Sequence, residues 1–223
     1  MFQNKKPVIA IDGTAGSGKG TLAKKIAKVL NFDHLDTGLL YRILAYEFLK
    51  LNKNLEMLRE INIDLNILLD KKKIKLMNLR SEEITKISSE IAKLEFVRKK
   101  LISLQRKFAN NPPSGIGSVI DGRDITSVIV PNAEIKFYID ADVKIRAERR
   151  VSQLVLPESS YNEILKDLIQ RDFQDKRRKI SPLIKTADSQ FIDTSKINES
   201  EVLIKAIEHI KKKLILFSDC IWD

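Results

Sequence analysis

The residues with the clearest chemistry form a glycine-rich segment near the start of the chain. Glycines stand at positions 13, 16, 18 and 20, and Lys19 lies among them. Glycine lets backbone N–H groups turn toward phosphate oxygens without a Cβ collision, and a lysine at this place shields the β- and γ-phosphates during transfer. The segment therefore predicts the ATP-binding loop of a phosphoryl-transfer enzyme, formed by Gly13, Thr14, Ala15, Gly16, Ser17, Gly18, Lys19, Gly20 and Thr21.

The stretches on either side of the loop are typical of a strand and a helix. The apolar run from Pro7 to Asp12 ends at a glycine, as buried parallel strands often do, and apolar residues recur at helical spacing from Lys19 to Leu30. A helix N-terminus here would add its partial positive charge to the site. Gly20 separates Lys19 from Thr21, whereas the general loop pattern has Ser or Thr directly after the lysine. This form is similar to the loop of nucleoside monophosphate kinases and unlike that of GTPases and helicases.

Two further segments place polar side chains where strands should end. In Leu35-Asp-Thr-Gly-Leu-Leu-Tyr-Arg42, Asp36 or Thr37 would cap a helix, and Arg42 one turn later could face an acceptor phosphate. In Val119-Ile-Asp-Gly-Arg-Asp124, Asp121 could hold Mg²⁺ through its water molecules. A structural ion pair is the alternative for this second segment.

A basic segment lies later in the chain, within a polar stretch from 141 to 179 that has helical character. Five of the nine residues from Arg171 to Lys179 are basic, and Ser181-Pro182 is expected to end the helix. Arg171 and Arg178 lie seven residues apart, so one helix face could close over phosphates with bidentate guanidinium contacts. Solvent exposure is expected for the other basic residues of the segment, Lys176, Arg177 and Lys179.

The order of the remaining elements predicts an α/β fold. Further buried strands are expected at 118–121, 133–139 and 190–193, each followed by a helix, which indicates a parallel sheet flanked by helices. Between 52 and 111 the pattern changes: Ile63–Leu69 and Ile74–Leu79 resemble short strands, and Ser81–Phe108 a charged helix. We interpret 52–111 as an insertion into a single domain that spans residues 1–223.

Composition limits the class of protein. The single cysteine, Cys220, excludes an internal disulfide, and the apolar run after the N-terminus is too short for a signal sequence or a membrane span. We therefore expect a cytoplasmic protein with no membrane partner. The formal net charge of +10 is compatible with nucleic-acid binding or with attraction of small anionic substrates. His34 and His209 lack metal-ligand spacing, so neither is expected to bind a metal or to form a catalytic triad.

The four segments together resemble bacterial cytidylate kinases, in the order and spacing of that family, and the resemblance covers nearly the whole chain. It implies a P-loop kinase with a five-stranded parallel sheet, a small monophosphate-binding insertion at 52–111 and a helical lid at about 142–182. It also implies transfer of the ATP γ-phosphoryl group to CMP or dCMP with Mg²⁺, in pyrimidine nucleotide metabolism.

The resemblance assigns roles residue by residue. Ser89, Arg98 and Asp124 would face the cytosine base, Arg171 and Asp175 the sugar, and Arg123 the CMP phosphate; the implied CMP site as a whole is Thr37, Tyr41, Arg42, Ser89, Arg98, Arg123, Asp124, Arg171, Asp175 and Arg178. Catalysis would depend on Lys19, Arg123, Arg171 and Arg178, with Asp121 holding Mg²⁺ through water. Two departures are visible: the insertion before Ser89 looks shorter than usual, and Gln174 stands where an arginine is often found.

The expected partners are therefore ATP and CMP or dCMP, with no nucleic acid, and we expect a monomer. The sequence is also compatible with two other functions. One is a kinase for another acceptor, such as UMP, AMP or a metabolite hydroxyl. The other is a nucleic-acid-binding P-loop ATPase, suggested by the positive charge, although the sequence lacks a basic platform interleaved with aromatic residues.

Overall fold

The computed structural model of the chain describes residues 6–61 and 71–215. By its internal contacts the chain divides into two compact units, residues 1–35 with 108–223 and residues 36–107. The first unit contains the predicted phosphate loop. The second contains most of the segment predicted to be the insertion, together with the helix that precedes it.

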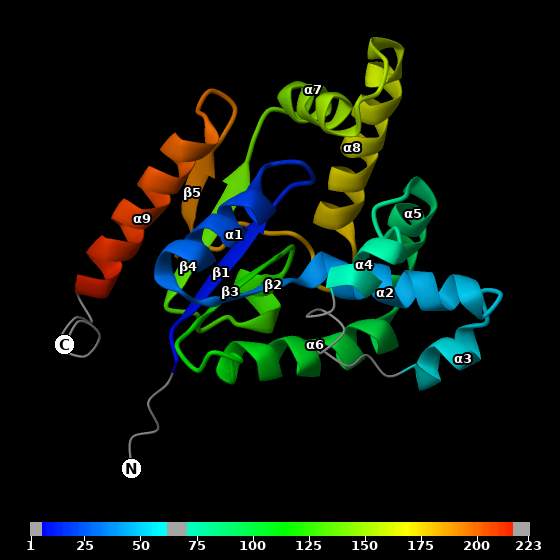
Figure 1. Ribbon diagram of the computed structural model, residues 1–223, viewed down its shortest axis with the longest axis horizontal. Helices are drawn as coiled ribbons and strands as arrows, with labels where there is room; N and C mark the ends of the chain where they lie inside the picture. Colours follow the sequence, from blue (N-terminus) through cyan, green and yellow to red (C-terminus); the bar gives the residue numbers. More distant parts are fainter. Residues whose placement is uncertain (1–5, 62–70, 216–223) are drawn as a thin grey trace. The chain divides into compact units, whose positions relative to one another are not determined.

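A five-stranded sheet is the centre of the first unit (Figure 1). Its order is β2-β3-β1-β4-β5, and β1 pairs in parallel with both β3 and β4, as β4 does with β5. The predicted α/β fold with a parallel sheet is confirmed. The bounds of the strands are Val8–Gly13 for β1, Asp33–Asp36 for β2, Ser118–Gly122 for β3, Ile135–Asp140 for β4 and Gln190–Asp193 for β5.

Two helices close one face of this sheet. Helix α1 (Lys19–Leu30) has the predicted bounds, and its residues Leu22 and Ile26 share one buried cluster with Ile11 and Phe137 of the sheet. Helix α9 (Glu199–Ile215) adds Val202, Ala206 and Ile210 to the same cluster. The apolar spacing of three and four residues places these side chains on one side of each helix.

Helices α7 (Val143–Leu154) and α8 (Tyr161–Arg177) pack against each other, joined by a short 3₁₀ turn at Glu158–Ser160. A π-helical turn, Ile125–Ile129, follows β3. Helices α7 and α8 lie in the segment predicted to be helical. Helix α8 ends at Arg177, before the predicted end at Ser181-Pro182, so Arg178 lies just beyond the helix and does not share a helix face with Arg171 as predicted. None of the helices in the described part of the chain is long and apolar enough to cross a bilayer.

The second unit consists of helices. They are α2 (Thr37–Lys50), α3 (Leu55–Glu60), α4 (Lys71–Leu76), α5 (Glu82–Ile91) and most of α6 (Glu95–Asn110). Helix α2 packs against α3 and α5. The single helix predicted over 81–108 is two helices, because the chain turns at Ala92–Leu94.

One predicted element of this unit is wrong. Ile74–Leu79 was expected to be a short strand, but its first half is the end of α4 and the rest is a turn. The alternation of Ile74, Lys75 and Leu76 suggested a strand, yet three residues do not define a period, and lysine favours a helix. Leu76 is 85% exposed, so the alternation does not mark a buried face. The other predicted strand, Ile63–Leu69, lies outside the described residues.

Candidate active site

The phosphate loop connects the end of β1 to the start of α1. A Cβ on Gly13 would lie 2.0 Å from the carbonyl oxygen of Ile139 in the neighbouring strand, so no larger residue fits there. Gly16 and Gly18 have φ angles of 76° and 85°, in the left-handed region that favours glycine. Gly13 is therefore required by the close approach of the neighbouring strand, and Gly16 and Gly18 by their backbone conformation.

Side chains hold the loop in this conformation. Thr14 donates its hydroxyl to Asp140 (2.6 Å), and the Thr14 carbonyl accepts from the Ser17 hydroxyl (3.0 Å) and from the Lys19 ammonium (3.3 Å). Thr194, which follows β5, donates to the Ser17 carbonyl at 3.0 Å. The bonds from Ser17, Lys19 and Thr194 engage loop carbonyl oxygens, and a loop held in this way is suited to binding an anion with its amides.

Asp12 lies directly before the loop and is completely buried. Its carboxylate accepts hydrogen bonds from the amides of Ile125 (2.9 Å) and Thr126 (2.7 Å) and from the Thr126 hydroxyl (2.7 Å). Burial raises the pKa of Asp12 to about 6, although these hydrogen bonds act in the opposite direction. Asp12 thus ties β1 to the π-helical turn that follows Asp124.

The predicted acceptor residues of the first unit form one charged cluster. Arg123 is paired with Asp175 at 2.7 Å, and Arg178 lies 3.4 Å from Asp175 and 3.8 Å from Asp124. Burial alone would lower the pKa of Arg123, but the charge of Asp175 and the hydrogen bond to it raise the pKa above its ordinary value. Burial and the nearby Arg123 lower the pKa of Arg171 to about 10. Asp175 and three arginines are thereby brought into one electrostatic network, as an anion-binding site requires.

The predicted acceptor residues of the second unit also lie close together. Asp36 caps α2 by accepting from the Leu39 amide (3.3 Å), and Thr37 begins the helix. Arg42 donates to the hydroxyl of Thr85 at 2.6 Å, and Ser89 donates to the Thr85 carbonyl at 3.1 Å.

Arg98 completes this group. It is almost completely buried, donates to the Ala92 carbonyl (2.6 Å) and lies 5.7 Å from the centre of the Tyr41 ring. The second unit therefore gathers Thr37, Tyr41, Arg42, Ser89 and Arg98 along α2, α5 and the start of α6.

The family model for cytidylate kinase matches residues 9–212 of the chain. The chain belongs to the cytidylate kinase family. Its relatives include cytidylate kinases of Bartonella tribocorum, 45% identical over 86% of this chain and 88% of that protein, and of Bartonella bacilliformis, 43% identical over 89% and 92%. The cytidylate kinase of Fusobacterium nucleatum is 38% identical over 92% of this chain and 98% of its own.

Solved structures support the fold alone. An uncharacterised protein from Eubacterium ventriosum superposes with a TM-score of 0.55 at 18% identity, covering 92% of this chain and 99% of its own. A Thermus thermophilus protein gives a TM-score of 0.50 at 15% identity, with coverage of 95% and 99%. The resemblance to cytidylate kinases predicted from the motifs is thus confirmed at the level of family and fold.

The chemistry of the family calls for a divalent cation, and the residues beside the loop fit one held through water. Asp121 is the last residue but one of β3, and a Cβ on Gly20 of the loop would lie 3.5 Å from its carboxylate. Within the described residues no group of three or more His, Cys, Asp or Glu side chains could hold a metal directly. Mg²⁺ commonly keeps several water ligands and uses one or two carboxylates plus substrate phosphates, which this arrangement can provide.

Several partners of the site residues could not be predicted from the sequence. His34 lies 2.7 Å from Asp121, although the two are 87 positions apart and no spacing rule links them. Arg146 and Asp172, both buried, contact Ala15 of the loop. Arg149 donates to the hydroxyl of Thr194 (3.0 Å) and to its carbonyl (2.6 Å). Arg146 and Arg149 could not be recognised from the sequence, because arginines in a polar helical stretch are usually exposed to solvent.

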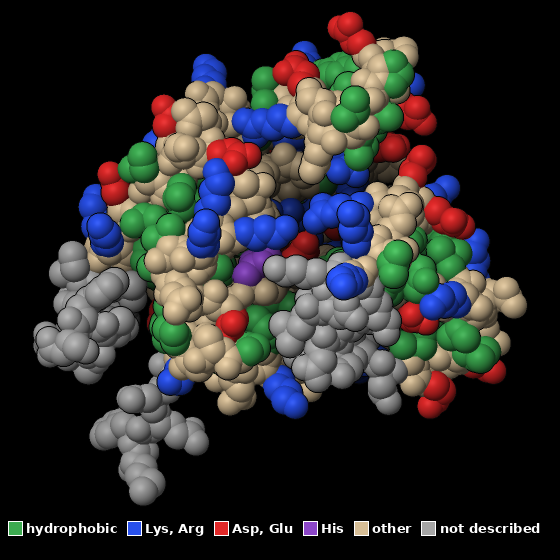
Figure 2. Space-filling model, viewed as in Figure 1, with side chains coloured by type: hydrophobic (Ala, Val, Ile, Leu, Met, Phe, Trp, Pro, Cys, Tyr) green, Lys and Arg blue, Asp and Glu red, His purple; other side chains and the backbone are tan. Residues whose placement is uncertain are grey.

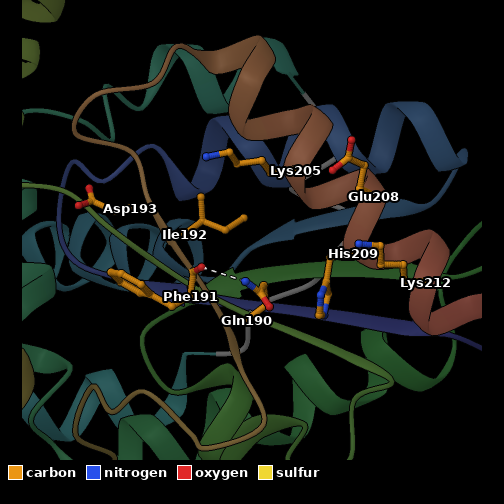
Figure 3. Close-up of a pocket in the computed structure, with 8 residues that line it drawn as sticks. All are labelled: Gln190, Phe191, Ile192, Asp193, Lys205, Glu208, His209 and Lys212. Atoms are coloured by element: carbon orange, nitrogen blue, oxygen red, sulfur yellow. Dashed lines mark hydrogen bonds between the residues drawn. The ribbon is translucent and has the colours of Figure 1, made fainter.

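A pocket of about 420 Å³ lies between β5 and α9, and none of the residues that line it belongs to the loop (Figure 3). His209 contributes its ring, which packs edge-on against Phe137 with ring centres 5.4 Å apart. Burial and the neighbouring Lys213 and Lys212 lower the pKa of His209. Because its ring packs against a phenylalanine of the core, we interpret His209 as a packing residue. We assign this pocket no role in phosphoryl transfer.

Proposed function

We propose that the chain transfers the γ-phosphoryl group of ATP to CMP or dCMP, producing CDP or dCDP and ADP. The observation that carries this proposal is the match to the cytidylate kinase family over residues 9–212, which includes the phosphate loop and every predicted acceptor residue. Relatives named cytidylate kinase at 38–45% identity, aligned over most of both chains, support the same reaction.

Charge screening is the main catalytic task in this reaction, because donor and acceptor are both anions. The loop cradles the donor phosphates, with Lys19 at the β- and γ-phosphates, and Arg123, Arg171 and Arg178 supply further positive charge from one cluster. Asp121 would hold Mg²⁺ through water, and the ion would supply further positive charge against the donor phosphates. No covalent intermediate with the protein is required, because alignment and electrostatic stabilisation suffice for phosphoryl transfer.

Acceptor recognition is proposed to involve both groups of predicted residues. Arg123 binds the CMP phosphate, Arg171 and Asp175 the sugar, and Ser89, Arg98 and Asp124 the base. The remaining pocket residues are Thr37, Tyr41, Arg42 and Arg178. Helices α7 and α8 belong to the proposed lid at about 142–182, which would exclude water as a competing acceptor.

The +10 charge is better explained by anionic substrates than by nucleic acid. On the face shown in Figure 2, acidic and apolar side chains lie among the lysines and arginines of each unit. Lys176, Arg177 and Lys179 are exposed, as predicted for a solvated helix face. We therefore propose small-molecule nucleotides as partners of a monomeric, cytoplasmic enzyme.

A panel of acceptors tests the proposal. ADP formation from Mg-ATP is measured by a coupled assay with CMP, dCMP, UMP, AMP and no acceptor. We expect kcat/KM for CMP and dCMP to exceed that for UMP and AMP by about a hundredfold or more, because a site built to pair polar groups rejects acceptors that leave them unpaired. Equal activity with UMP would identify a different acceptor specificity. ATP hydrolysis that needs nucleic acid and no monophosphate would instead identify an ATPase.

A further inference from the structure

Ala15 lies in the middle of the phosphate loop, and both of its backbone polar groups are bound by one pair of side chains. Its amide donates to Asp172 of α8 (3.3 Å), and its carbonyl accepts from Arg146 of α7 (3.0 Å). Arg146 and Asp172 are themselves paired at 2.7 Å. The three residues thus form a closed ring of hydrogen bonds that joins the loop to two helices.

This ring is buried and has its own apolar support. Arg146 is 4% exposed and Asp172 is 8% exposed. Arg146 is oriented by a further bond from its Nε to the Ala141 carbonyl (2.8 Å). Ala15 also packs with Ala147 of α7 and Leu168 of α8 in a small buried cluster. The middle of the loop therefore rests directly on the α7–α8 pair.

The position of Asp172 on α8 connects the ring to the acceptor cluster. Asp172 directly follows Arg171, and one turn later Asp175 holds Arg123 at 2.7 Å. The same stretch of helix therefore bonds the donor loop and orients side chains proposed for the acceptor. A change in the loop-to-helix distance would displace the donor phosphates relative to Arg123 and Arg171.

We propose that Arg146 and Asp172 are positioning residues, which hold Ala15 against α8 and so align the donor loop with the acceptor-binding side chains. This inference rests on the proposed function for its catalytic meaning. A purely structural ion pair is a weak alternative, because desolvating two charges gives little net stability and an apolar pair of similar volume often packs as well. The planar guanidinium, by contrast, reaches Ala141 through Nε and Ala15 and Asp172 through a second nitrogen, a fixed geometry that the single nitrogen of a lysine does not reproduce.

Two single variants remove the ring in different ways. Asp172→Asn keeps an oxygen acceptor for the Ala15 amide but removes the charge, and Arg146→Met removes the donor to the Ala15 carbonyl. For both we expect kcat to fall roughly 10- to 100-fold, since a misplacement of about 1 Å can cost a hundredfold in rate. KM for CMP should change less than about threefold, because both variants keep the side chains that we propose to bind CMP.

A double variant and a matched control separate positioning from stability. Arg146→Met/Asp172→Asn leaves no buried charge unpaired, so it should unfold at higher urea than Arg146→Met alone, while its kcat stays low. Lys136→Met removes another buried cation of the same unit, paired with Asp188 at 2.6 Å and not bonded to the loop. It should lower stability and leave kcat within about twofold of wild type.

ATP affinity, measured by calorimetry without any acceptor, keeps this inference distinct from the proposed function. We expect Kd for ATP to rise about tenfold in Asp172→Asn, because loss of the charge at residue 172 weakens its pairing with Arg146, which holds the Ala15 carbonyl. If wild type fails to phosphorylate CMP, the proposed function fails, yet the change in ATP affinity still tests the ring. Recovery of kcat in the double variant, an equal loss in Lys136→Met, or unchanged ATP affinity in Asp172→Asn would overturn the inference.

Discussion

Lys19 is the residue whose side chain we propose to act most directly on the donor phosphates. It begins α1, and its ammonium lies 3.3 Å from the Thr14 carbonyl within the loop. We predict that Lys19→Met lowers kcat roughly a hundredfold or more, since one preorganised charge contact contributes about 3 kcal/mol to transition-state stabilisation. Steady-state kinetics at saturating ATP and CMP measure this loss.

The matched control for this prediction is Lys24→Met on the same helix. Lys24 is exposed on α1, so its replacement should leave kcat and the urea midpoint nearly unchanged. Wild-type turnover in Lys19→Met would exclude Lys19 from the mechanism. A comparable loss in Lys24→Met would show that kcat responds to net charge instead of the loop contact.

Asp124 carries the prediction on base selectivity. It is 5% exposed, and its carboxylate lies 3.8 Å from Arg178. A carboxylate accepts from the amino group of cytosine and repels the carbonyl oxygen that uracil presents there. We predict that Asp124→Asn lowers kcat/KM for CMP and reduces the CMP-to-UMP ratio, because an amide can donate to that oxygen.

Kinetics with both acceptors in wild type and variant decide this point. A buried polar group left unpaired costs on the order of 1–3 kcal/mol, so the ratio should fall at least about tenfold. If the ratio is unchanged while both activities fall, Asp124 does not read the base, and its function is to orient Arg178.

Residues with chemistry at short spacing could be predicted from the sequence, whereas residues that act through distant partners could not. The loop from Gly13 to Thr21 has its chemistry in consecutive residues. Asp172 reaches the Ala15 amide across 157 positions, and Asp12 reaches Ile125 across 113. Neither distance leaves a local pattern, because the parallel sheet and the packing of α8 bring these residues together.

At the scale of elements, the helices and strands with long and regular sequence patterns were the ones predicted correctly. β1 and α1 were predictable because a buried strand, a glycine turn and three turns of helix have distinct periods. The strands at 118–121 and 190–193 were recognisable as short apolar runs before helices. Helix α4 was misread because its six residues include only one apolar-polar alternation. A short segment of this kind takes its structure from tertiary packing.

The residue that ends helix α7 has an unfavourable backbone conformation, which gives a prediction about this helix. Val155, its C-cap, has a φ angle of 53° and donates its amide to Val151 and Ser152 carbonyls. The left-handed conformation costs a side-chain-bearing residue about 1–2 kcal/mol, most of all when it is β-branched. The side chain is 90% exposed and loses no packing on removal. We predict that Val155→Gly raises the free energy of unfolding by about 1 kcal/mol in urea titrations.

The control is the same substitution at a valine with ordinary helical geometry. Val29 is 56% exposed within α1 and has no positive φ. Val29→Gly should lower stability by about 0.5–1 kcal/mol, because glycine is the poorer helix former. Destabilisation of similar size in both variants would contradict the role assigned to the left-handed conformation at Val155.

At the scale of the whole molecule, the proposed site combines positively charged groups with carboxylates of low exposure that limit the net positive charge. Asp12, Asp124 and Asp175 lie in the same unit as the loop and the arginine cluster. Asp175 keeps a lowered pKa because Arg123 offsets the effect of its burial. For Asp12 the effect of burial exceeds that of its hydrogen bonds, and its pKa rises. The two carboxylates therefore affect stability in opposite directions as pH changes.

Asp12 gives a prediction about how the stability of the whole molecule depends on pH. Its pKa is about 6 in the folded chain and near its ordinary value of 3.8 in the unfolded chain. Between these two values the folded state binds more protons, so this group's contribution to stability is full below about 3.8 and is lost as pH rises through about 6. A difference of about two pKa units corresponds to roughly 3 kcal/mol.

The Asp12→Asn variant has no ionisable group at this position, so it lacks this contribution to the pH dependence of stability. Whatever its absolute stability, the variant should gain up to roughly 3 kcal/mol relative to wild type when pH is raised from 4 to 7. Urea unfolding of both proteins at the two pH values gives this double difference, in which titrations common to both, such as that of Asp175, cancel. A difference near zero would mean that Asp12 is ionised throughout. The hydrogen bonds from Ile125 and Thr126 would then outweigh the effect of burial on its pKa.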